Sequence, residues 1–140
     1  MDLAKKVVDK MFDNDLFSQW LGIERMIIET GHCKLKMKVR KEMLNGFGIL
    51  HGGVTFSLAD SALAFASNAH GRMAVALEAS ISYPVKAVVG DELTATAEEQ
   101  NITNRTGIYY ITVINQRNEK VGLFKGVVYR TEKKWFPEDV

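Results

Sequence analysis

Cysteine is nearly missing from this sequence, because Cys33 is the single one among 140 residues. A lone cysteine excludes an internal disulfide and a cysteine-ligated metal cluster, and it is typical of proteins from a reducing compartment. An excess of charge is missing as well, since 18 lysines and arginines stand against 17 aspartates and glutamates. A net charge of +1 creates no basic field for nucleic acid, so we expect no nucleic-acid partner.

Long apolar segments are also absent, since no run approaches the roughly 18 residues of a membrane-spanning helix. The segment from Met1 to Asp15 lacks the charged-then-apolar order of a signal peptide. We therefore expect a cytoplasmic protein that makes no contact with membranes.

Several catalytic and ligand-binding motifs are missing too. The chain has no G-x-S-x-G segment for a serine nucleophile, no phosphate-binding P-loop and no Rossmann glycine pattern. Its histidines, His32, His51 and His70, are not spaced as zinc ligands are. We expect neither a bound metal nor a cofactor.

The chain does have enough residues for one domain with its own core, which we place at residues 1–140. Apolar residues at helical spacing over residues 2–13 predict a short amphipathic helix in the N-terminal segment 1–14. The segment 131–140 is rich in charge, and we expect it to form a loose tail, in which Trp135 and Phe136 can still dock on the domain.

Strands dominate the rest of the chain, and they flank one unusual helix. From Cys33 to Arg40 apolar and basic residues alternate strictly, which predicts a half-buried strand. Residues 54–68 are apolar around nearly the whole helical circumference, which predicts a helix buried on nearly every side. Further strands are predicted at residues 23–29, 73–83, 93–102, 108–115 and 121–130.

This order of elements predicts an α+β fold, in which one antiparallel β-sheet wraps around a single long central helix. One sheet can cover that helix on one side only. Because residues 54–68 are apolar on the other sides as well, a second copy of the chain has to cover part of the helix. The helix composition therefore predicts an oligomer.

Asp60 needs an explanation because it lies in the middle of this apolar helix. An unpaired buried carboxylate is costly, and folds rarely keep one without a partner or a use. Two interpretations stay open at this point. Asp60 either bonds a backbone group or an arginine across the sheet, or it has a catalytic task.

The segment His51-Gly52-Gly53 stands at the start of the same helix, where the first amide N–H groups lack intrahelical partners. Such a terminus can hold an anion or polarise a carbonyl, although paired glycines can also form just a tight corner. Gly52 and Asp60 are eight residues apart. Because that spacing is roughly 12 Å along a helix, action on one carbonyl requires helices from two subunits.

Asn45 lies in a glycine-rich loop six residues before His51. Its amide can orient a water or a substrate carbonyl, or it can serve as a turn residue before Gly46. Basic side chains are candidate contacts for a phosphorylated substrate such as a nucleotide-bearing thioester, although alternating lysines are usually a solvated strand face. These candidates are Lys34, Lys36, Lys38, Arg40, Arg72, Lys86 and Arg105.

The segment from Asn45 to Asp60, NGFGILHGGVTFSLAD, resembles the signature of hotdog-fold acyl-CoA thioesterases, and most of all their PaaI-type branch of phenylacetate degradation. TGIY at 106–109, NQ at 115–116 and GLFKG at 122–126 also resemble that branch. The resemblance implies a hotdog fold and a homodimer with shared active sites. It also implies that two such dimers usually form a homotetramer.

The resemblance further implies roles for individual residues. Asp60 acts as general base or nucleophile, and the amide of Gly52, with that of Gly53, polarises the thioester carbonyl. Asn45 positions water or substrate, and His51 shapes the loop rather than transferring protons.

Some relatives carry a serine or threonine on the strand after the helix that helps to place water. Here Ala76 takes that position, which leaves Ser80 and Ser82 as nearby substitutes. We include Ser82 among the substrate-binding candidates, together with Arg105 as a phosphate contact.

The function implied is hydrolysis of an acyl-CoA thioester to the free acid and CoA, with phenylacetyl-like acyl groups favoured by the resemblance. The partners are then the acyl-CoA substrate and further copies of the chain. The alternative is a non-catalytic acyl-CoA binding or sensing module on the same fold. A hotdog dehydratase is a third option, but those enzymes pair a catalytic histidine with a helix carboxylate, which the position of His51 does not resemble.

Overall fold

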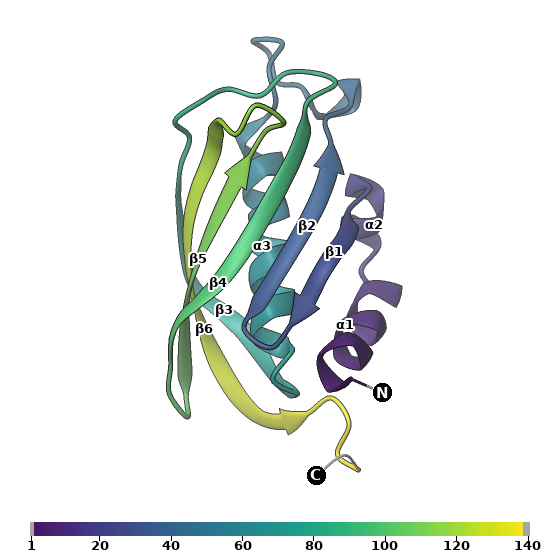
Figure 1. The fold of residues 1–140 in the computed structure, drawn as a ribbon, viewed down its shortest axis with the longest axis vertical. Coiled ribbons are helices and arrows are strands. Elements are labelled where there is room, and N and C mark those ends of the chain that lie inside the picture. The colour runs from purple at the N-terminus through teal and green to yellow at the C-terminus, as the bar shows by residue number, and fades with distance from the viewer. Residues whose placement is uncertain (1, 139–140) are drawn as a thin grey trace.

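The computed structural model describes residues 2–138 and shows one antiparallel sheet curved around the long helix α3 (Gly52–Asn68) (Figure 1). The six strands lie in the order β1-β2-β4-β5-β6-β3. This arrangement confirms the predicted hotdog fold class. The strands are β1 (Glu24–Glu29), β2 (His32–Lys38), β3 (Arg72–Ser82), β4 (Glu92–Ile102), β5 (Thr106–Ile114) and β6 (Lys120–Lys134).

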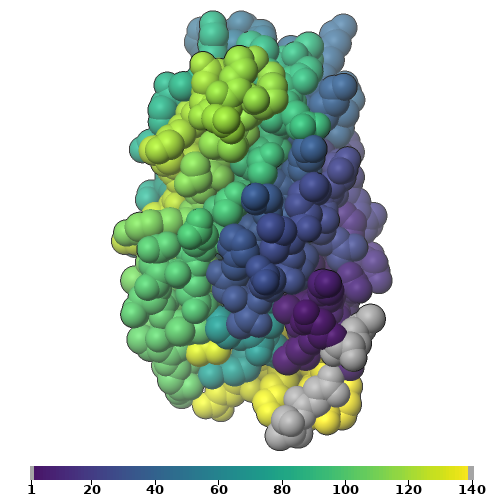
Figure 2. Space-filling model, viewed as in Figure 1, coloured from purple at the N-terminus to yellow at the C-terminus, as the bar shows by residue number. Residues whose placement is uncertain are grey.

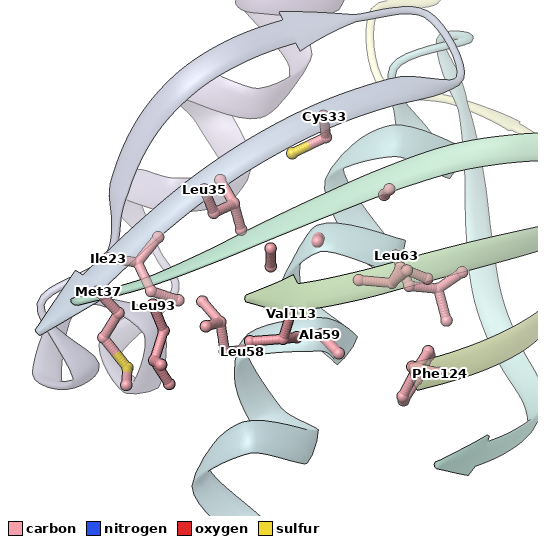
Figure 3. Close-up of a cluster of buried hydrophobic side chains, with 14 of the residues drawn as sticks. Ile23, Cys33, Leu35, Met37, Leu58, Ala59, Leu63, Leu93, Val113 and Phe124 are labelled. Carbon is pink, nitrogen blue, oxygen red and sulfur yellow. The ribbon is translucent and has the colours of Figure 1, made fainter. Parts of the chain in front are cut away.

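The inner face of the sheet and one side of α3 form a single hydrophobic core (Figure 3). The predicted alternation along β2 is confirmed, because Cys33, Leu35 and Met37 are buried while the lysines between them stay partly exposed. Burial raises the pKa of Cys33 to about 12, so its thiol stays protonated in the core.

Glycines of β6 let the sheet close tightly on α3. A Cβ atom added at Gly126 would lie 2.6 Å from Cδ2 of Leu63, and one at Gly122 would lie 2.9 Å from Cγ2 of Thr55. Both contacted side chains belong to the helix. The missing side chains of β6 therefore set the distance between the sheet and α3.

One stripe of α3 is not fully covered within the chain. Val54, Ser57, Asp60 and Ala64 follow one another at helical spacing, and each is only partly buried. The predicted burial of the helix on nearly every side thus holds except along this stripe. It is the surface that the expected second copy would have to cover.

Two helices precede the sheet and lie beside α3 and β1, namely α1 (Leu3–Asp13) and α2 (Leu16–Leu21) (Figure 1). The predicted amphipathic character of α1 is confirmed, because Ala4, Val7 and Val8 are buried while its lysines lie at the surface. A short 3-10 turn, η1 (Lys41–Met43), leads from β2 toward α3. Within residues 2–138, no helix is long and apolar enough to cross a membrane.

The segment after Thr131 differs from the expected loose tail. β6 continues to Lys134, which pairs with Arg72 of β3, and the indole N–H of Trp135 donates to Oδ1 of Asn68 at 2.9 Å. Phe136 lies against α1, with Nζ of Lys6 4.2 Å from its ring centre. The purple N-terminal helix and the yellow C-terminal segment accordingly lie at the same end of the molecule (Figure 2). The expectation was wrong here because β3 offers a continuing ladder to this charged segment. Residues 139–140 lie outside the described residues.

Candidate active site

His51 organises the start of α3 as its N-cap. Its Nδ1 accepts a hydrogen bond from the amide of Gly53 at 2.8 Å, which places the ring proton of the neutral imidazole on Nε2. The amide of Gly53 is therefore already used. The N–H of Gly52 has no acceptor within residues 2–138, and so it is the amide donor that this terminus offers to a ligand.

A hollow of about 270 Å³ lies at this helix start and brings Gly52 and Asn45 together. Oδ1 of Asn45 accepts from the amides of Phe47 at 2.9 Å and Ile49 at 3.3 Å, which is the expected turn role. These bonds leave the side-chain N–H₂ of Asn45 available as a donor. The remaining residues that line the hollow are Ile49, Leu50, Thr55, Tyr83, Val85, Lys86, Ala87 and Val121.

Tyr83 is a residue of this hollow that the sequence did not single out. Its hydroxyl donates to the carbonyl oxygen of Gly52 at 2.9 Å, and its ring carbon Cζ would lie 3.1 Å from a Cβ atom at that position. Glycine at position 52 thus lets the tyrosine approach the helix start. No local signal predicts the contact, because Tyr83 follows β3 and lies 31 residues away along the chain.

Asp60 lines a second, smaller hollow of about 100 Å³, which is otherwise built from Leu63, Ala64, Ser67, Ala74, Ala76 and Val128. Its carboxylate is partly buried and has neither a hydrogen bond nor an ion pair within residues 2–138. The interpretation that Asp60 bonds an arginine or a backbone group therefore finds no support in the described residues. Burial raises the pKa of Asp60 above its ordinary value, and the negative charge of Asp15 raises it further.

The two hollows share no lining residue, and one chain does not bring Gly52 and Asp60 together. The helix between them rises by roughly 12 Å over eight residues. Ala76 lines the hollow beside Asp60, where it offers a methyl group in place of a hydroxyl.

The other expected contacts lie elsewhere. Ser82 lines a third hollow on β3, β5 and β6, together with Ser80 and Leu123. Arg105 lies at the surface, where it binds Glu132 at 3.3 Å, and it lines neither of the two hollows of α3.

Of the basic candidates, only Lys86 lines the hollow that holds Asn45 and Gly52. Arg72 is held elsewhere, since its guanidinium donates to the carbonyl oxygens of Thr131, Asn104 and Arg130. Within residues 2–138, no three histidine, cysteine, aspartate or glutamate side chains gather where they could hold a metal ion.

Fold and motif together define a hotdog-fold hydrolase of thioesters, and the chain belongs to the thioesterase superfamily, whose family model matches residues 47–121. Acyl-coenzyme A thioesterase PaaI of Escherichia coli K12 is 40% identical over 120 residues, which cover 86% of each chain. A protein of Archaeoglobus fulgidus whose name places it among the esterases is 41% identical over 135 residues, covering 96% of this chain and 88% of that protein.

Solved structures agree with these relatives. The structure of Escherichia coli PaaI matches with a TM-score of 0.92 and 37% identity, covering 94% of this chain and 96% of that chain. A Streptococcus mutans protein solved with acetyl-CoA bound matches with a TM-score of 0.78 and 28% identity, covering 80% and 90% of the two chains. The resemblance to the PaaI-type thioesterases is confirmed.

Proposed function

We propose that this thioesterase hydrolyses an acyl-CoA to the free acid and CoA in a site that two subunits share. The observation that carries the proposal is the unpartnered carboxylate of Asp60 on the uncovered stripe of α3. Within residues 2–138 the Gly52 amide, at the start of the same helix, likewise has no acceptor. Two antiparallel α3 helices would set the Gly52 of one subunit beside the Asp60 of the other.

The start of α3 supplies the electrostatics of the reaction. The N–H of Gly52, aided by the positive end of the helix dipole, stabilises the oxyanion that forms when the thioester carbonyl is attacked. The side-chain N–H₂ of Asn45 lines the same hollow and can orient the carbonyl or the attacking water. His51 holds the glycine backbone in place through its Nδ1 and takes no part in proton transfer.

Asp60 supplies the base. In the general-base route it takes a proton from water, the resulting hydroxide adds to the carbonyl carbon, and the carbon–sulfur bond then breaks to release the CoA thiolate. A thiolate is a good leaving group, so this step needs no strong acid. In the alternative route the carboxylate of Asp60 attacks the carbonyl carbon, and the carbon–sulfur bond breaks to release the CoA thiolate and leave a mixed anhydride. Water then hydrolyses this anhydride to the free acid and restores Asp60.

The edge of the sheet supports a dimer. β3 is a terminal strand of the sheet, and it exposes Val75 and Leu77 to 55% and 61%. An apolar strand edge of this kind is suited to pairing with a second copy. We propose a homodimer paired through β3, with two such dimers forming a homotetramer as in the family that the chain resembles.

Separate observations support acyl-CoA as the substrate. The Escherichia coli relative is named an acyl-coenzyme A thioesterase, and the Streptococcus mutans structure holds acetyl-CoA. Lys86 lines the hollow of Gly52 and presents an ammonium group to the phosphates of CoA. A phenylacetyl-like acyl group is the one that we propose for the apolar part of the site.

Thiol release from a panel of aryl-, short-chain and long-chain acyl-CoAs tests the proposal. We expect the wild type to release CoA from aryl thioesters, and we expect Asp60→Asn to lower kcat/KM by roughly 10²–10⁴-fold without unfolding. Full activity in Asp60→Asn would contradict the role of this residue. Binding of acyl-CoA without any thiol release would favour the binding or sensing module instead.

Mixing two inactive variants tests whether the site is shared. Asp60→Asn removes the base, while Gly52→Ala keeps its N–H but places a methyl group 3.1 Å from Cζ of Tyr83, which crowds the start of α3. Each variant alone is therefore expected to lose activity. A co-refolded mixture should regain about a quarter of the wild-type activity, because half of the dimers are mixed and each has one intact site. No recovery in mixed dimers isolated by two affinity tags would place both halves in one chain.

A further inference from the structure

The start of α2 brings a second carboxylate close to Asp60. Asp15 is the N-cap of α2, and its Oδ1 accepts from the amide of Ser18 at 3.0 Å while its Oδ2 accepts from the Ser18 hydroxyl at 2.6 Å. The Ser18 hydroxyl also lies 2.8 Å from the hydroxyl of Ser61, in a buried contact with α3. Ser61 directly follows Asp60.

The protons in this network have one consistent arrangement. The single hydroxyl proton of Ser18 is donated to Asp15, so Ser61 has to donate its own proton to Ser18. The chain of bonds from Ser61 to Asp15 therefore ends on a carboxylate. It fixes that carboxylate relative to α3 at the level of Asp60.

The hollow that Asp60 lines contains no other charged side chain of the described residues. From α3 itself its neighbours are Leu63, Ala64 and Ser67, and these are uncharged. The neighbouring strands contribute Ala74 and Ala76 from β3 and Val128 from β6, which are apolar. Burial is the larger cause that raises the pKa of Asp60, and within residues 2–138 the negative charge of Asp15 raises it further.

We propose that Asp15 is a positioning residue for the reaction, a fixed negative charge that makes Asp60 a stronger proton acceptor without touching the substrate. This inference rests on the proposed role of Asp60 as the base of the thioesterase reaction. Like charges oppose each other, so a second carboxylate makes Asp60 bind a proton more tightly. A base that binds its proton more tightly removes one from water more effectively.

The charge of Asp15 can be removed while its cap is kept. In Asp15→Asn the side-chain oxygen still accepts from the Ser18 amide, and asparagine is as good an N-cap as aspartate. Its N–H₂ group can donate to the Ser18 hydroxyl, which then donates to Ser61. Asp13→Asn is the matched control, because Asp13 is an exposed carboxylate two residues away that does not act on Asp60.

The pH profile of kcat/KM is the first measurement. Activity falls as Asp60 takes up a proton, so the acid limb of the profile reports its protonation. We expect this limb to move to lower pH in Asp15→Asn, with a lower plateau, and to stay in place in Asp13→Asn. The inference would be overturned if the acid limb of the kcat/KM profile stayed at the same pH in Asp15→Asn, or if it moved equally in Asp15→Asn and Asp13→Asn.

A second measurement is independent of activity. The chain has seven aspartates, so ¹³C labelling of their carboxyl groups gives few signals, and the one that is lost in Asp60→Asn identifies Asp60. We expect its titration midpoint to fall in Asp15→Asn and to stay unchanged in Asp13→Asn. If the wild type released no thiol from any acyl-CoA, the proposed function would fail while this titration still decided whether Asp15 acts on Asp60. An unchanged midpoint in an active enzyme would overturn the inference alone.

Discussion

At the scale of single residues, the candidate active site contains a carboxylate that gains no stabilising bond from the described part of the fold. Asp60 is partly buried beside alanines and a valine, and it has no partner within residues 2–138. Burial and the charge of Asp15 both raise its pKa, so its charged form is less favourable in the folded protein than in the unfolded chain. In its proposed role as a base, Asp60 would contribute to catalysis at the expense of stability.

We therefore expect Asp60→Asn to be more stable than the wild type at neutral pH. Because the pKa of Asp60 is higher in the folded state, the folded protein binds the proton more tightly, and stability declines as the carboxyl ionises with rising pH. Thermal unfolding of both proteins measures the effect, from about pH 3, below the ordinary aspartate pKa of about 3.9, to about pH 8. The difference should be largest at neutral pH and vanish in acid, where the carboxyl is protonated in both states. A wild type that is the more stable protein at pH 7 would contradict this prediction.

At the scale of the elements, the segments outside α3 that resemble the thioesterase family, such as TGIY and GLFKG, contribute to the fold rather than to the candidate site. In the TGIY segment, a Cβ atom at Gly107 would lie 2.9 Å from the ring of Tyr109, whose hydroxyl donates to Glu99 at 2.7 Å. Burial alone would raise the pKa of Glu99, but the hydrogen bonds from Tyr109 and His70 hold it below its ordinary value. These segments therefore stabilise the turns and layers that carry the site.

The GLFKG segment makes the contact between β6 and α3 sensitive to one methyl group. We expect Gly126→Ala to lower the free energy of unfolding by about 1–3 kcal/mol, because its Cβ atom would overlap with Leu63 in a packed core. Denaturant unfolding measures the change. Gly46→Ala is the control and should be nearly neutral, since no atom lies within 4 Å of a Cβ atom there. Equal effects of the two substitutions would show that the close approach of β6 to α3 is not the cause.

At the scale of the whole molecule, the proposed activity depends on a surface that the single chain leaves uncovered. β3 ends the sheet on one side, and β1 ends it on the other. The uncovered stripe of α3 and the exposed edge of β3 are both suited to contact with a second copy of the chain. In the proposed dimer, assembly and catalysis are therefore inseparable, because each subunit contributes half of every site.

Leu77→Lys tests that dependence. A lysine on the exposed edge of β3 places charge in the proposed interface, so we expect monomers and loss of most activity together. Sedimentation velocity gives the state of assembly, and thiol release gives the activity. The control is Met26→Lys on β1 at the opposite edge, where the side chain is 51% exposed, and it should leave both unchanged. An active monomer of Leu77→Lys would contradict the shared site.

The sequence by itself determined the elements and the fold class. It also identified Gly52 and Asp60, the two residues on which the proposed chemistry depends. The alternation from Cys33, the apolar circumference of α3 and the glycines after His51 are local patterns that follow from the periods of strand and helix. The resemblance of the segment from Asn45 to Asp60 then identified the thioesterase class, which the comparisons confirmed.

Only the tertiary structure decided which hydrogen bonds and which neighbouring side chains surround those residues. It assigned the free amide to Gly52 rather than Gly53, placed Tyr83 over the helix start, and ordered the chain to Trp135. It also placed Asp15 of α2 near Asp60 of α3. The hydrogen bond between Gly53 and His51 is local, but the other features depend on contacts between segments that lie far apart in the sequence. Local propensities carry no information about those contacts. The packing of α2, β3 and β6 around α3 is what brings them together.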